Sequence, residues 1–146
     1  MIGRLLGIDH GIARIGIAVS DPLGITATEL RVIERASKAE DFALLNQIAK
    51  RENVVGIIVG IPYNEAPEGV HTQADTVRLW IERFSTTTAL PIVEWDEQLS
   101  SEDAKELAKR QGRHVRDPID DLAARVILQS YINAVNDGLA TPPPRP

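Results

Sequence analysis

The sequence contains no cysteine among its 146 residues. This absence excludes a disulfide-stapled scaffold, a thiolate metal site and a cysteine nucleophile. The sequence also lacks a run of about 18 apolar residues, the length that a membrane-spanning helix needs. Its N-terminus shows no charged leader region followed by a cleavage site, so we expect no secretory signal. Together these absences favour a cytoplasmic location.

The chain has a formal net charge of −5, with 16 basic and 21 acidic residues. Nucleic-acid-binding domains are usually basic, so this balance argues against bulk nucleic-acid binding unless acids and bases gather in separate clusters. The hydrophobic content of 43% is typical of a soluble globular protein. We predict one domain over residues 1–138, and a disordered, proline-rich tail at 139–146 whose "TPPPRP" stretch cannot pack.

Hydrophobic periodicity predicts an α/β fold: a mixed sheet of five strands with helices on its faces. Three strands form an antiparallel meander, and two more alternate with helices. The expected strands are two in Leu5–Ala18 around a turn at Gly11, then Thr28–Arg35, Val54–Gly60 and the stretch after Pro91. The expected helices begin at Ser37, cover His71–Phe84 and Ser100–Gln111, and run from Asp117 to about Asn136.

Asp9 stands alone as an acid within the otherwise apolar first strands. A carboxylate there costs free energy unless something binds it. One interpretation is that Asp9 accepts hydrogen bonds from amides of the adjacent turn. The other is that it belongs to a site at the end of the strand.

Asp96 and Glu97 lie at the carboxyl end of the last predicted strand, before a helix. In open α/β sheets, this edge is where functional sites form. Either residue could also be a loop acid stabilised by the dipole of the following helix. The spacing alone does not choose between the two acids.

The last predicted helix begins with a third group of acids. Asp117 matches an N-cap and Asp120 matches the third helical position of a capping box. Asp121 is spaced to pair with Arg125. Taken alone, the segment favours capping over chemistry.

The acids at these three places could converge on one edge of the sheet. Clustered carboxylates repel, and a partner of high positive charge holds them ionised. Because cysteine is absent and histidine is scarce, that partner would be a hard cation with oxygen ligands, Mg²⁺ or Mn²⁺. Two such ions could support hydrolysis of a phosphodiester bond.

A basic segment, "KRQGRHVR" at 109–116, stands directly before the last predicted helix. Its residues Arg113 and Arg116 are candidates for phosphate contacts next to the acidic site. The alternative is a solvated basic helix end that the helix dipole favours.

Four motifs are similar to those of the YqgF/RuvX family, Holliday-junction-resolvase-like proteins with an RNase H-like fold. They are "GIDHGIARIGIAVSDPLG", "IIVGIPYNEAPEG", "WDEQLSS" and "IDDLAARVILQSYI", in that order. The first is long and specific, and the fourth alone is weak. The match extends from about Leu5 to Tyr131.

The resemblance implies that Asp9, Glu97 and Asp120 are the catalytic, metal-binding acids. Arg14 matches the arginine of the first motif and is expected to contact nucleic acid. The third motif departs from the family pattern, because Gln98 replaces an arginine. That replacement removes a positive charge beside the acids.

The resemblance also implies a metal-dependent nuclease, with maturation of the 5′ end of pre-16S ribosomal RNA as the usual assignment. The expected partner is RNA or branched DNA, with no membrane, and the chain would be a monomer or a homodimer. A Holliday-junction resolvase and a non-catalytic, ribosome-associated RNA-binding module are the alternatives. The "GIDHG" stretch also resembles the phosphate loop of actin-like ATPases and sugar kinases, which need two such domains.

Overall fold

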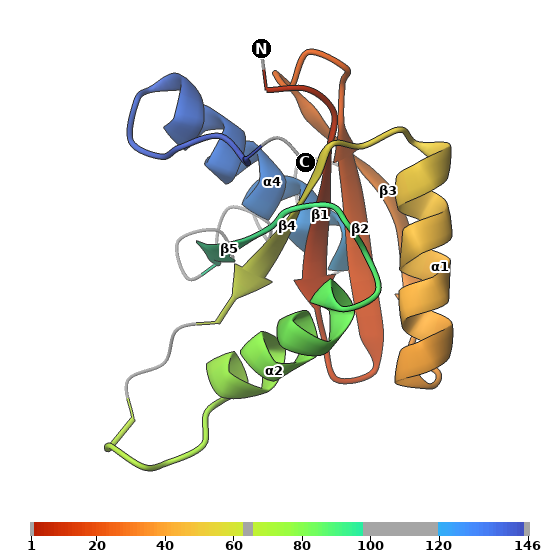
Figure 1. The fold of residues 1–146 in the computed structure, drawn as a ribbon. Helices are drawn as coiled ribbons and strands as arrows, with labels where there is room; N and C mark the ends of the chain where they lie inside the picture. Colours follow the sequence, from red (N-terminus) through yellow and green to blue (C-terminus); the bar gives the residue numbers. More distant parts are fainter. Residues whose placement is uncertain (1, 63–65, 98–119, 145–146) are drawn as a thin grey trace, which may run out of the picture.

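A computed structural model describes residues 2–62, 66–97 and 120–144, and for residues 120 and 121 it describes the backbone alone. Its sheet has five strands in the order β3-β2-β1-β4-β5, with α1 and α2 over one face and α4 over the other (Figure 1). The strands are β1 (Leu5–His10), β2 (Arg14–Ser20), β3 (Ala27–Glu34), β4 (Gly56–Ile61) and β5 (Ile92–Asp96). The helices are α1 (Lys38–Arg51), α2 (Gln73–Ser85) and α4 (Asp120–Asn136).

The sheet is mixed, as the strand pattern predicts. The first three strands pair antiparallel, and β1 pairs parallel with β4, which pairs parallel with β5. Every residue of β4 is buried, which confirms that its continuous apolar run is a strand covered on both faces. Because β1, β4 and β5 run in the same direction, their carboxyl ends meet at one edge, here called the site edge.

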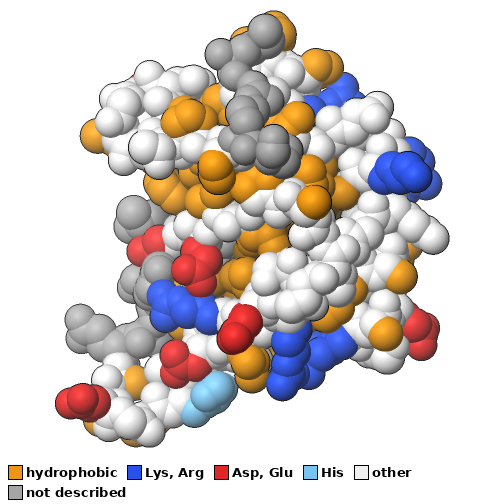
Figure 2. All heavy atoms as spheres, viewed as in Figure 1, with side chains coloured by type: hydrophobic (Ala, Val, Ile, Leu, Met, Phe, Trp, Pro, Cys, Tyr) orange, Lys and Arg blue, Asp and Glu red, His pale blue; other side chains and the backbone are white. Residues whose placement is uncertain are grey.

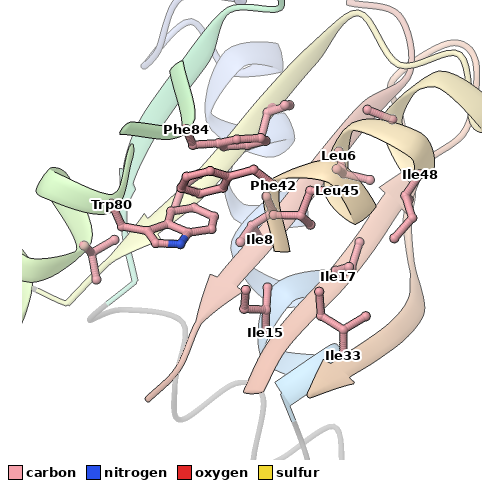
Figure 3. Packing of buried hydrophobic residues seen from close by; sticks show 14 of the residues in the cluster. Leu6, Ile8, Ile15, Ile17, Ile33, Phe42, Leu45, Ile48, Trp80 and Phe84 are labelled. Atoms are coloured by element: carbon pink, nitrogen blue, oxygen red, sulfur yellow. The ribbon is translucent and has the colours of Figure 1, made fainter. Parts of the chain in front are cut away.

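The face under α1 and α2 carries a closed apolar core (Figure 3). Ile8 and Ile17 point from the sheet toward aromatic rings that the two helices supply. The rings of Phe42 and Phe84 stack with their centroids 5.2 Å apart, and Trp80 packs against both. Such aromatic pairs each add about 0.5–1.5 kcal/mol beyond the area that they bury.

The other face is covered by α4, which approaches the sheet closely. A Cβ added to Gly7 would lie 2.8 Å from Cβ of Leu128 and 3.1 Å from the carbonyl oxygen of Ala124. A side chain larger than hydrogen at residue 7 would therefore push the helix away. Val135, in the last turn of α4, lines a surface pocket together with Ile2. The helix thus runs antiparallel to β1 and begins at the site edge.

Local sequence signals account for the helix starts. The Ser37 hydroxyl accepts a hydrogen bond from the amide of Glu40, which confirms Ser37 as the N-cap of α1. Thr72 and Asp75 form a reciprocal capping box at α2. The predicted helix at 100–111 and the basic segment at 109–116 lie outside the described residues.

The prediction that the proline-rich tail cannot pack is wrong for residues 140–143. The Tyr131 hydroxyl donates a 2.6 Å hydrogen bond to the carbonyl of Thr141, and Ala140 packs against the α4 core. The ring of Pro143 lies 3.2 Å from the position that a Cβ on Gly56 would occupy. A strand glycine leaves a gap that the proline ring covers, and composition alone does not reveal such a gap. No helix within the described residues is long and apolar enough to cross a membrane.

Candidate active site

Asp9 is the last residue of β1 whose side chain faces α4. Side chains alternate along a strand: Leu5 belongs to the core under α4, whereas Leu6 and Ile8 belong to the core under α1 and α2. Asp9 follows the same alternation onto the α4 face and is half-buried there. Its backbone is paired with Gly16 of β2, so the position of the carboxyl group is set by the centre of the sheet.

Glu97 reaches the same place from the other side of β4. Its backbone amide donates a 3.1 Å hydrogen bond to the carbonyl of Ile61, which extends the pairing of β4 and β5 by one residue. The Glu97 side chain is half-buried and is hydrogen-bonded to the side chain of Asp9. Two acids from distant parts of the sequence therefore meet at the site edge.

Gly60 separates the two acids in the sheet and allows their contact. A Cβ at residue 60 would lie 2.7 Å from Oε2 of Glu97 and 2.6 Å from Cδ1 of Ile127 on α4. Only glycine leaves room for both the carboxyl group and the helix. Gly60 is a site residue that the sequence motifs did not single out. A glycine inside an apolar strand was the available signal, because it indicates close approach of another group.

The electrostatics of the acid pair follow from burial. Burial raises the pKa of Glu97, the hydrogen bond with Asp9 lowers it, and the charge of Asp96 raises it again. An ionised carboxylate only accepts hydrogen bonds, so a bond between two carboxyl groups needs a shared proton. A cation at this place would take over the role of that proton. The donor set, carboxylate oxygen, suits a hard cation such as Mg²⁺ or Mn²⁺.

Asp96 is not the member of the pair that meets Asp9. It is the last residue of β5 and is paired with Ile61. Because Asp96 and Glu94 are two residues apart on the strand, their side chains point to the same face of the sheet. Glu94 forms a 3.3 Å ion pair with Arg78 of α2, on the opposite face of the sheet from α4. Alternation therefore assigns Asp96 to the α2 side, from which its charge still acts on Glu97.

Asp120 is the first residue of α4. It precedes Ala124, which packs on Gly7, by one helical turn along the same face. The backbone of Asp120 therefore lies toward the site edge, while its side chain is outside the described part of the structure. Among described side chains there is no cluster of three metal-binding residues; Asp9 and Glu97 are a pair. The third ligand stays a prediction.

The predicted cationic residues are only partly described. Arg14 begins β2 and is exposed, opposite Glu34 of β3. Arg113 and Arg116 lie outside the described residues. The side chain of Arg125 pairs with Glu29 at 2.9 Å, whereas the side chain of Asp121, its predicted partner, is not described.

The chain is similar in sequence to known proteins over most of its length. The family described as "RuvX: Holliday junction resolvase" matches residues 3–134. A protein of Symbiobacterium thermophilum is 40% identical over 135 residues, which cover 90% of this chain and 92% of that protein. A protein of Syntrophus aciditrophicus is 35% identical over 137 residues, which cover 91% of this chain and 90% of that protein. Both bear the provisional name pre-16S rRNA nuclease.

Solved structures share the fold at low sequence identity. Thermus thermophilus RuvC, in complex with a Holliday junction substrate, superposes with a TM-score of 0.64 at 14% identity and covers 97% of this chain and 99% of that chain. The resolvase of fowlpox virus, in complex with Holliday junction DNA, superposes with a TM-score of 0.55 at 12% identity. The match covers 90% of this chain and 98% of the viral chain. The likeness supports an RNase H-like fold.

Proposed function

The chain belongs to the RuvX family and is a nuclease, and from this premise we propose that it hydrolyses phosphodiester bonds in precursor 16S ribosomal RNA, at the 5′ end. The relatives' name supports the choice of RNA. The observation that carries the proposal is the contact between the side chains of Asp9 and Glu97 at the site edge. A protein selected only for stability would not bring two half-buried carboxyl groups together.

We propose that Asp9, Glu97 and Asp120 hold Mg²⁺ or Mn²⁺. When bound, such an ion activates water and stabilises the charge that develops on a phosphodiester in hydrolysis. Asp9 is held by the central strand, and Glu97 is held by the ladder bond to Ile61 and the space above Gly60. The protein thereby presents its carboxylate oxygens in a fixed arrangement, which lowers the reorganisation that the reaction requires.

We propose that Arg14, Arg113 and Arg116 contact the phosphates of the substrate. Each phosphate contact releases counterions from the nucleic acid, so binding should weaken as the salt concentration rises. Replacement of Arg113 and Arg116 together by alanine should flatten the dependence of binding on salt by roughly one to two units. An unchanged slope in that variant would show that the nucleic acid follows another path.

The proposed function is tested by cleavage of a substrate panel. The panel holds an RNA spanning the mature 5′ end of 16S rRNA with its precursor extension, the same sequence as DNA, and a four-way DNA junction. We expect cleavage of the precursor RNA in Mg²⁺ or Mn²⁺, none in EDTA, and none by Asp9→Asn. Full activity of Asp9→Asn would refute the metal role, and binding of RNA without cleavage in either ion would favour the non-catalytic module.

The family description favours a second candidate, resolution of branched DNA. Cleavage of the four-way junction in preference to the precursor RNA would support it. A resolvase that cuts two strands symmetrically requires two copies of its site. The molar mass in solution, with and without junction DNA, would therefore separate a monomeric RNA nuclease from a dimeric resolvase.

A further inference from the structure

The tip of the hairpin between β1 and β2, residues 11–14, is held rigidly at the site edge. The amide of Gly11 donates a 2.9 Å hydrogen bond to the carbonyl of Arg14. Nη1 of Arg35 donates to the carbonyls of Gly11 and Ile12, both at 3.1 Å. The amide of Arg35 donates to the carbonyl of Ala13 at 2.9 Å. The hairpin tip is thus fixed from both its own strands and the end of β3.

The bonds from Arg35 depend on a buried charge. Nε of Arg35 lies 3.8 Å from Oδ2 of Asp41, whose side chain is 3% exposed, and Oδ1 of Asp41 accepts a 3.0 Å bond from the amide of Ala36. Burying these charges costs free energy. Water would hydrate the carbonyls of an exposed turn without this arrangement. The gain from the Arg35–Asp41 pair is therefore rigidity of the hairpin tip.

Ile12 is presented to solvent on this rigid element. Its side chain is 87% exposed, the highest value among the large hydrophobic residues of the described part of the chain. A single exposed aliphatic residue is common on protein surfaces. Ile12 differs by its position, because three peptide units limit its Cα to about 11 Å from the Cα of Asp9. An apolar side chain is thus presented at the same edge of the sheet as the acid pair.

The charge around the hairpin tip suits a polyanion. Residues 10–20 contain no Asp or Glu although the chain as a whole has a net charge of −5. Arg14 is exposed at the base of the tip, with Glu34 as its neighbour across the strands. Figure 2 shows Lys or Arg side chains between α1 and α2 at this end of the molecule. These positive charges lie at the same end of the sheet as Asp9.

We propose that the hairpin tip is a substrate-contacting element, on which Ile12 packs against an unstacked base within about three nucleotides of the cleaved bond. This inference rests on the proposed nuclease function. Rigid aliphatic side chains, isoleucine among them, act as wedges against bases in other nucleic-acid-binding proteins. Because the tip is already ordered, the contact forms without an entropic cost of ordering the loop.

The test measures binding without cleavage, in the Asp9→Asn background and in Mg²⁺. The probe is the precursor 16S RNA with 2-aminopurine at successive positions around the mature 5′ end, because its fluorescence reports unstacking. We expect Ile12→Ser to weaken binding about tenfold and to abolish the fluorescence change at one or two positions, and Ile12→Leu to retain both. The matched control is Leu139→Ser, since Leu139 is 81% exposed just after α4, whose last turns lie far from the site edge.

Equal affinity and equal fluorescence in Ile12→Ser and its parent would overturn the inference, as would equal weakening in Leu139→Ser. The fluorescence and cleavage readouts distinguish failure of this inference from failure of the proposed function. If the parent with Asp9 intact does not cleave, the proposed function fails, whereas a base contact through Ile12 still appears in fluorescence. Circular dichroism of each variant checks that the overall secondary structure is retained, and Ile12 is exposed enough for its replacement to leave the core intact.

Discussion

The two faces of β1 handle buried polar groups in opposite ways. Asp9 points toward α4 and shares a hydrogen bond with Glu97, while the next residue, His10, points toward α1 and α2 and packs 4.7 Å from the ring of Trp80. Burial and the nearby charge of Arg35 lower the pKa of His10 to about 4. His10 is therefore a neutral part of the core at pH 7. On the other face, the protein keeps two acids together, which is a state that a cation can stabilise.

This contrast separates stability from function along a single strand. The face under α1 and α2 keeps His10 neutral, pairs the buried Asp41 with Arg35, and fills its core with aromatic rings. The face under α4 uses glycines at 7, 56 and 60 to admit a helix, a proline ring and a carboxyl group. Variants on the first face should change the free energy of unfolding, and variants at the site edge should mainly change cleavage.

The largest expected effect is on cleavage by Asp9→Asn. The substitution removes a carboxylate oxygen that we assign to the metal, so the rate should fall by about a thousandfold or more. It also removes repulsion within the acid pair, so the melting temperature without metal should stay the same or rise. Cleavage in Mg²⁺ and thermal unfolding in EDTA measure the two effects. A large loss of thermal stability would instead indicate that Asp9 serves the fold.

Gly60→Ala should lower both the stability of the fold and the rate of cleavage, with cleavage affected more. The new methyl group must displace the Glu97 carboxyl group or Ile127, and overpacking of this kind costs about 1–3 kcal/mol. We expect cleavage to fall at least about tenfold, since a misplacement of 1 Å can cost a hundredfold.

Gly56→Ala is the matched control, because Gly56 faces α4 from the same strand but contacts Pro143 and Leu5 instead of the acids. It should lower stability modestly and leave cleavage near the parent's rate. Equal loss of cleavage in the two variants would mean that Gly60 has no special relation to Glu97.

Protonation of His10 should make the free energy of unfolding depend on pH. The pKa of His10 is lower in the folded chain than in the unfolded chain, so its contribution is complete above about pH 6.5 and is lost as the pH falls toward 4. Between pH 7 and pH 5 the free energy of unfolding should fall by up to about 2 kcal/mol from this group.

Urea unfolding of the parent and of His10→Phe at both pH values isolates this contribution. The raised pKa of Glu97 acts in the opposite direction at acid pH and is present in both proteins, so it cancels. The same slope with pH in the variant would show that His10 titrates freely.

The smallest effect is expected at the end of the chain. Tyr131→Phe removes the 2.6 Å hydrogen bond to Thr141 but keeps the packing of its ring, which lies edge-on to Trp95. We expect a loss of about 1 kcal/mol and faster hydrogen exchange at the amides of Ala140 and Thr141, because the next three residues are prolines without an amide hydrogen. Cleavage should not change. Unchanged exchange in the variant would show that the tail is held by Pro143 alone.

The fold could be predicted from the sequence because its signals are local. The strand-forming runs on either side of the turn at Gly11, the continuous apolar run of β4, and Ser37 at the start of α1 each act within a few residues. The family motifs identified Asp9 and Glu97 as site acids, and the structure brings these two together. The role of Asp120, and those of Arg113 and Arg116, remain predictions.

The sequence by itself determined the order of the elements, which acids were candidates, and the absence of thiol chemistry. Only the tertiary structure explains why Glu97, which the family motif implied, and not Asp96 meets Asp9, because the register of β5 against β4 puts the two side chains on opposite faces of the sheet. It also decided that Gly60 must lack a side chain and that the proline-rich tail packs on Gly56. These contacts join residues far apart in the chain. Their geometry depends on how closely strands and α4 approach, which no local pattern of residues encodes.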